Sequence, residues 1–449
     1  MKPFDRQLRP LIAFCLHSTA FLLAAATVPA TACFAQAPPT ASETNREETA
    51  GMSPMTQTGD GELPADAKPA DPTEAIESFK NAVEDEQTLA EGLKSVEVFD
   101  QTSLAFKESM VEMRRLYLEY ANGNPSTRSK TEYLKVRSES RKLMNETYDA
   151  ALDVLRFMPH PVAARFIVTG LLYRTQRSIY NLGTYEGAGR LLNAGVRLRY
   201  VAQSGARSGM VVGDFDFARR VYEKLEQDEL EDIDRRMIGL LEQIEKQFAT
   251  EKELLENQGE LPQVKFVTTR GEFVADLFID EAPSTVAHFI NLVESGFYDG
   301  LDFFQVVNEM LALTGDPVGD GSSKPDQYIA DEHGRETIRM PLRGSLVMAK
   351  LPIAGTADFV PNSAGTQFAI LFMPLPAVTS QQTVFGRIVE GMDVLGELRR
   401  VDPNKKKEKN ELVLPPDRIL TAEILRRPES LPEVQYVVQP GMPTANATP

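Results

Sequence analysis

The chain has 449 residues, 42% of them hydrophobic, and a formal net charge of −17 at pH 7. This length exceeds what one compact core usually contains, so the sequence predicts two domains with additional tails. The acidity argues against nucleic acid or an anionic membrane surface as a partner, because both are themselves negatively charged.

The amino terminus has the pattern of an export signal. Basic residues stand at positions 2, 6 and 9, an apolar run follows to about position 28, and the sequence AQA ends at Ala37. We therefore expect a signal peptide over residues 1–37 and an exported protein, periplasmic or otherwise extracytoplasmic. A retained membrane anchor is the alternative, and lipidation at Cys33 stays open. Cys15 and Cys33 both lie inside this segment, which leaves a processed chain without a thiolate zinc site or a cysteine nucleophile.

Composition divides the next part of the chain. Residues 38–73 are rich in Pro, Thr, Ser, Gly and acidic residues, and we expect a disordered linker. Residues 74–258 show apolar side chains at three- and four-residue steps, which predicts an all-α domain of helical hairpins. A short echo, GTY at Gly183 and GDF at Gly213, resembles tetratricopeptide-like hairpins. Two copies are fewer than such arrays need, so a helical domain of other detail is the second interpretation. Either form would suit a protein partner.

After residue 258 the apolar period changes to two. Val264 and Phe266 alternate before a turn at residues 269–271, which indicates a hairpin, and Pro283 then opens a helix. Beyond residue 426 the chain is proline-rich, and residues 427–449 are expected to form a disordered tail.

Four ordered blocks lie within residues 263–426: VKFVTTRGEFVADLFIDEAPSTVAHFINLVESGFYDGLDFF, GSLVMA, NSAGTQFAIL and TVFGRIVEGMDVLGEL. Their order and spacing resemble the cyclophilin-type peptidyl-prolyl cis-trans isomerases. The resemblance implies a closed β-barrel with capping helices. It also implies a shallow apolar groove that binds proline-containing polypeptides and needs neither a metal nor another cofactor.

The same alignment implies the groove residues. Gln305 stands where the family carries its catalytic arginine, and Gln367 matches a glutamine that binds substrate backbone. Glutamine can donate a neutral hydrogen bond but lacks the charge and fork of guanidinium. The substrate-binding positions are filled by Met310, Leu311, Leu313, Ala349, Lys350, Ala369, Val378 and Gln382. Among them, Lys350 could supply a displaced positive charge or be an ordinary loop lysine.

The sequence thus favours an exported cyclophilin-type isomerase that assists the folding of exported proteins, with catalysis weakened at Gln305. The alternative is a catalytically inactive peptide-binding or scaffold protein that uses the helical domain as its interaction surface. His288 and His333 have no second ligand at metal spacing, so no metal site is predicted.

Overall fold

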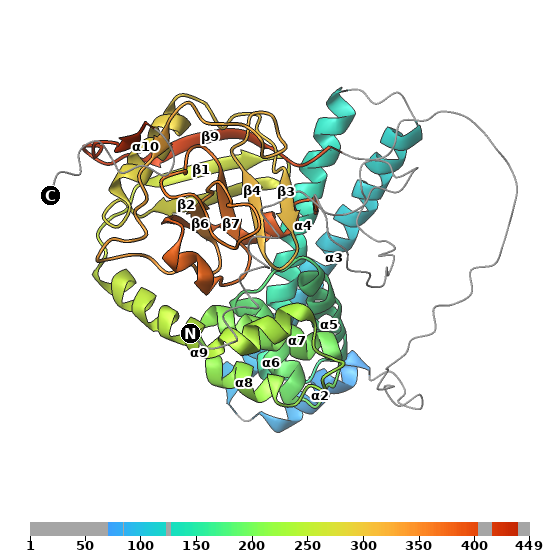
Figure 1. The fold of residues 1–449 in the computed structure, drawn as a ribbon. Helices are drawn as coiled ribbons and strands as arrows, with labels where there is room; N and C mark the ends of the chain where they lie inside the picture. Colours follow the sequence, from blue (N-terminus) through green and yellow to red (C-terminus); the bar gives the residue numbers. More distant parts are fainter. Residues whose placement is uncertain (1–70, 84, 123–126, 403–414, 439–449) are drawn as a thin grey trace, which may run out of the picture.

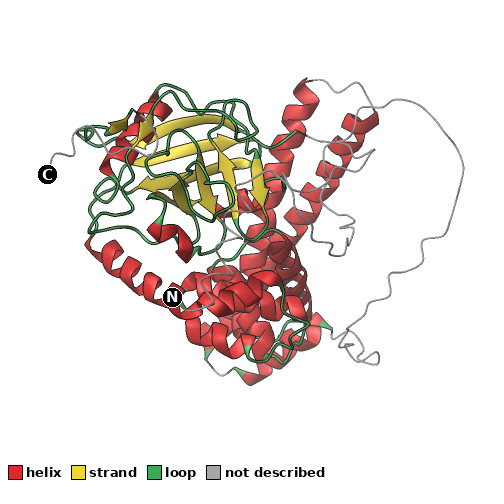
Figure 2. Ribbon diagram, viewed as in Figure 1, coloured by secondary structure: helices red, strands yellow, loops and turns green. Residues whose placement is uncertain are grey.

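The computed structural model describes residues 71–83, 85–122, 127–402 and 415–438. The predicted signal peptide and nearly all of the predicted linker lie outside these residues. A helical region comes first and a sheet domain follows, as expected (Figure 1). The two lie side by side, with the helices gathered against one end of the sheet domain (Figure 2). Within the described ranges, no helix combines the length and the apolar character that crossing a bilayer would require.

The helical region pairs neighbouring helices, and α3 packs along α4. Short polar caps start several of them: Asn181 accepts a hydrogen bond from the backbone N–H of Thr184, and Asp214 accepts one from Phe217. The described helices are α2 (Pro72–Ala82), α3 (Glu86–Asn122), α4 (Thr127–Phe157), α5 (Pro161–Gln176), α6 (Leu182–Asn193), α7 (Arg199–Val212), α8 (Phe215–Tyr222) and α9 (Asp232–Asn257).

The two echoed motifs occupy different places. Gly183 lies inside the first turn of α6, whereas Gly213 ends α7 in the left-handed conformation with φ 89°. A Cβ atom at Gly213 would also come within 2.5 Å of the Phe248 ring. Glycine is therefore required at position 213 by the left-handed backbone and the nearby Phe248 ring, whereas neither requirement exists at position 183.

The sheet domain contains one eight-stranded sheet in the order β3-β4-β7-β6-β8-β2-β1-β9. Its strands are β1 (Gln263–Thr268), β2 (Gly271–Leu277), β3 (Gln305–Val307), β4 (Leu311–Thr314), β6 (Ser345–Met348), β7 (Phe368–Leu371), β8 (Val384–Glu390) and β9 (Ile419–Arg426). Around it lie α10 (Pro283–Glu294), the 3-10 helix η1 (Pro376–Ser380) and α11 (Met392–Gly396).

The sheet curls into a half-barrel, so the expected closed barrel is not confirmed. Its edge strands β3 and β9 do not pair as a ladder in the described residues. The segment before β3 approaches β9 through an isolated bridge, Asp302↔Arg418, and through the hydrogen bond from the N–H of Phe303 to the Asp417 carbonyl.

The predicted disordered tail contains a strand. In β10 (Tyr436–Val437) the chain pairs antiparallel with β5 (Tyr328–Ile329). The Tyr436 ring also meets His288 edge to face at 5.7 Å between centroids. Composition suggested disorder after residue 426, but these long-range contacts order the segment up to residue 438.

Candidate functional site

The candidate site begins with a row of facing residues that crosses four strands. Gln305 pairs with Leu313, Leu313 with Ala369, and Ala369 with Val347. Directly opposed residues point to the same face of a sheet, so the Gln305 side chain emerges beside Leu313. The next residue in β3, Val306, points the other way and lies in the main core of the sheet domain.

This row forms part of an apolar cavity with a volume of about 20 Å³, enough for about one water molecule. Its lining residues come from β4, β6, β7 and the segment through η1: Met310, Leu311, Leu313, Val347, Ala349, Ala369, Leu371, Leu375, Val378 and Gln382. Seven of the ten predicted site residues therefore meet in one place. Gln305, Lys350 and Gln367 are not among the lining residues.

Three lining residues were missed by sequence reasoning. Val347 and Leu371 lie two residues from Ala349 and Ala369, so strand alternation could have identified them. Leu375 lies in an irregular segment between β7 and η1, where no periodic signal was available.

Gln382 is only 6% exposed, and its Nε2 donates to the Met348 carbonyl at 3.1 Å. Gln305 is also 6% exposed, and its side chain lies on the same face of the sheet as the cavity-lining Leu313. The cavity therefore has apolar walls with neutral amides beside it, which suits an apolar ring and a backbone peptide group.

Lys350 does not supply a charge to the cavity. Its Nζ lies 2.6 Å from the Asp331 carboxylate and donates to the Gln381 carbonyl at 2.9 Å, and the residue is only 7% exposed. A buried ammonium group keeps such partners because losing them would cost several kcal/mol, on the order given for buried ion pairs. Lys350 is therefore neither a displaced cation of the groove nor an ordinary exposed loop lysine.

Gln367 is held by a loop built on Asp316. Its Nε2 donates to Asp316 Oδ1 at 3.2 Å. Gly315, with φ 89°, permits the close approach of this loop, because a Cβ atom there would lie 2.3 Å from the Thr366 carbonyl oxygen. Gln367, the predicted backbone-binding residue, thus lies two positions before Ala369 of the cavity row. Its hydrogen bond to Asp316 fixes the orientation of its side chain.

The Asp316 carboxylate accepts four backbone hydrogen bonds, from residues 319, 320, 321 and 323. Burial opposes its charged form, but the bonds from Ser323 and from the backbone outweigh burial and lower the pKa of Asp316. A lowered carboxyl pKa contributes stability above the ordinary value of about 3.9, and this is lost as the pH falls through the folded-state pKa.

We therefore expect Asp316→Asn to lower the free energy of unfolding at pH 7 by about 1 to 3 kcal/mol, because an amide nitrogen cannot accept these bonds. The difference from the wild type should shrink below about pH 4. Urea denaturation at several pH values measures both effects. Asp326→Asn, an exposed change in the same loop, is the control. Equal losses at pH 3 and pH 7 would contradict the assignment.

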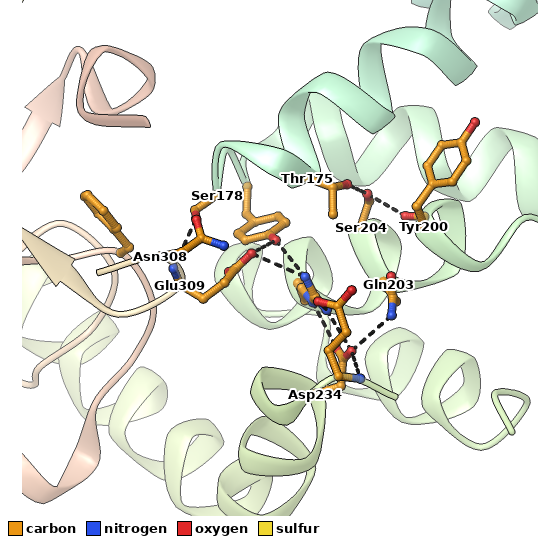
Figure 3. A network of polar contacts seen from close by, with 12 residues as sticks. Thr175, Ser178, Tyr200, Gln203, Ser204, Asp234, Asn308 and Glu309 are labelled. Carbon is orange, nitrogen blue, oxygen red and sulfur yellow. Dashed lines mark hydrogen bonds and ion pairs between the residues drawn. The ribbon is translucent and has the colours of Figure 1, made fainter. Parts of the chain in front are cut away.

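A buried polar network joins the helical region to the turn before Met310 (Figure 3). Arg207, on α7, makes two bonds of 2.7 Å to the Asp234 carboxylate. Its Nη1 lies 3.3 Å from Glu309 Oε1, and the Tyr180 hydroxyl donates to the same oxygen at 2.6 Å. Burial raises the pKa of Glu309, while Arg207 opposes the shift. Sequence reasoning missed this network, because its members are dispersed along the chain.

The chemistry open to this site is limited. The described residues contain no group of His, Cys, Asp and Glu able to hold a metal, and the cavity lining contains no nucleophile beside a base. Such a site offers apolar walls and neutral amide groups to a peptide segment.

Comparisons with known proteins identify the family. The model described as "Cyclophilin type peptidyl-prolyl cis-trans isomerase/CLD" matches residues 263–424. The chain is 32% identical over 147 residues to "Peptidyl-prolyl cis-trans isomerase CYP18-2" of Arabidopsis thaliana, which covers 32% of this chain and 84% of that protein. It is 34% identical over 137 residues to a peptidyl-prolyl cis-trans isomerase of Helicobacter pylori, covering 30% of this chain and 78% of the relative.

Among solved structures, a cyclophilin type isomerase of Cryptosporidium parvum is 24% identical, with TM-score 0.31, covering 38% of this chain and 100% of that chain. The sequence relatives establish that the chain belongs to the cyclophilin-type peptidyl-prolyl cis-trans isomerases. It is therefore an enzyme of that class, whose family domain occupies the carboxyl-terminal part.

Proposed function

We propose that the protein is exported and that its groove isomerises prolyl bonds of exported polypeptides, at a rate reduced by the neutral Gln305. The observation that supports this most directly is the row Gln305–Leu313–Ala369, which runs from the family's arginine position into the apolar cavity. In this proposal Gln367 binds substrate backbone and Gln305 donates to the prolyl peptide group.

The physical task is to lower a torsional barrier of about 18 to 20 kcal/mol without breaking a bond. Acceleration requires contacts that strengthen as the amide twists. An apolar cavity holds the proline ring in place, and a donor beside it weakens the double-bond character of the amide. The glutamine amide provides that donor without charge, and charged hydrogen bonds are roughly twice as strong as neutral ones.

The test is a protease-coupled isomerisation assay on prolyl peptides, with chain that begins at residue 38. The expected result is a rate above the uncatalysed one. A rate equal to the uncatalysed one would reject the proposal. Secretion of the full chain with cleavage near Ala37, followed by mass measurement, tests the export part separately.

Filling the cavity should strongly reduce turnover. Ala369→Leu adds three carbon atoms at a lining position of a cavity with room for about one water, so we expect at least a tenfold loss of kcat/KM. Overpacking should cost about 1 to 3 kcal/mol of unfolding free energy, which denaturation will measure. Ala249→Leu, exposed on α9, is the matched control. Retention of full activity by Ala369→Leu would show that substrate does not use this cavity.

A second candidate is peptide docking without turnover, and the neutral Gln305 at the family's arginine position favours it. The helical region would then carry the main partner surface. Saturable binding of a prolyl peptide without acceleration in the same assay would select this candidate.

A further inference from the structure

Helix α9 contacts both walls of the cavity. One wall is the turn of residues 308–310 between β3 and β4, and the other is the segment of residues 373–380 that includes η1. At the start of α9, Arg236 Nη2 donates to the Glu309 carbonyl at 2.9 Å. Farther along, Gln247 Nε2 donates to Thr379 Oγ1 at 3.0 Å.

Each of these anchors adjoins a cavity-lining residue. Glu309 precedes Met310 and Thr379 follows Val378, and both Met310 and Val378 line the cavity. Arg236 and Gln247 are eleven residues apart on one helix, which corresponds to a rise of about 16 Å. A single rigid element thus fixes the spacing of the two walls.

Packing and charge hold the helix in this place. Met373, in the second wall, is buried within the core of the helical region together with Met237 and Ile244 of α9. At the far end of the helix, the buried Glu251 carboxylate accepts from Arg339 at 3.0 Å and from Arg387 at 2.7 Å. Detaching α9 would leave buried charges unpaired, so these ion pairs hold α9 in a fixed position.

We propose that α9 sets the width of the cavity, and that Arg236 and Gln247 are positioning residues for the prolyl substrate. The proposal rests on the proposed function. A cavity of about 20 Å³ admits one water molecule but no proline ring, so the walls separate when substrate binds. A helix fastened to both walls opposes that separation and raises KM. Loosening one anchor therefore lowers KM.

The experiment is a double-mutant cycle across the Gln247–Thr379 bond. Gln247→Ala and Thr379→Val each remove it from one side, and the expected result is a KM lowered about three- to tenfold, the range for one hydrogen bond, with kcat changed less than twofold. The KM of the double variant should equal that of each single variant, because both substitutions remove the same hydrogen bond and their effects do not multiply. Gln243→Ala, an exposed position one turn away on α9, should leave KM unchanged.

A second readout does not depend on turnover. Carbon-13 labelled methionine methyl groups report the cavity wall through Met310, whose resonance is assigned with Met310→Leu. This resonance should shift in Gln247→Ala and in Thr379→Val but not in Gln243→Ala.

The two failures are distinguishable. A wild-type chain without turnover or peptide binding rejects the proposed function. In that case the Met310 resonance still tests whether α9 sets the width of the cavity. An unchanged Met310 resonance in both cycle variants overturns the proposal. So does a KM that stays at the wild-type value in both, or that moves equally in Gln243→Ala.

Discussion

Arg207→Met is expected to lower the free energy of unfolding by about 3 to 5 kcal/mol, the range for removing one partner of a buried ion pair. The Arg207 side chain is 1% exposed, and it faces the fully buried Asp234 carboxylate and the nearly buried Glu309. Methionine keeps much of the apolar volume but donates no hydrogen bond. The carboxylates would then stay buried without their cation, and this uncompensated charge causes the loss.

Urea denaturation measures the effect, and Arg156→Met is the control. Arg156 also pairs with two carboxylates, Asp153 and Glu186, but its side chain is 49% exposed. A surface pair of this kind contributes about 0 to 1 kcal/mol. Similar losses in the two variants would contradict the special role of the buried network.

The loss should depend on pH with a definite sign. The pKa of Glu309 is already raised by burial, and removing Arg207 takes away the group that opposes that shift. A carboxyl group with a raised pKa stabilises the folded state below its unfolded pKa of about 4.3 and ceases to do so as the pH rises through the folded pKa. The Arg207→Met variant should therefore lie closer to the wild type at pH 4 than at pH 7.

Gln305→Arg is expected to raise kcat/KM for prolyl peptides by about 10- to 100-fold. The reason is that a charged donor beside the twisting amide is roughly twice as strong as a neutral one, and preorganised donors in a dry site have large effects. Two further variants separate charge from geometry. Gln305→Lys adds charge without the planar fork and should gain less, whereas Gln305→Met removes the donor and should fall below the wild type.

The control for this series is the free energy of unfolding of each variant. Gln305 is 6% exposed, so a guanidinium group introduced there must reach solvent or a partner. A folded Gln305→Arg variant with unchanged kcat/KM would show that the groove cannot use a cation, and it would favour peptide docking without turnover.

Sequence reasoning succeeded where side chains follow a local period. Leu313 and Ala369 lie on strands whose period of two fixes the face that each residue takes. It failed where a partner lies far along the chain. Lys350 was interpreted as an exposed loop residue because no sequence pattern around it indicates its partner Asp331, 19 positions away. The Arg207–Glu309 contact spans 102 positions and joins two domains, so no pattern within either domain indicates it.

The pairing of β1 with β9 also governs the order in which this protein can acquire its structure. Gln263 opposes Arg426, so β1 can pair with the neighbouring β2 early, but its other edge stays unpaired until β9 has been synthesised. The helices contact mainly their neighbours along the chain and can assemble during synthesis, because local contacts form fastest and amino-terminal units fold first. During that interval Arg207 has Asp234 beside it but not Glu309, which arrives with the sheet domain. The helical region can therefore fold first, and its ion pairs to the sheet domain, Arg207–Glu309 and Arg177–Glu397 among them, form only when that domain docks.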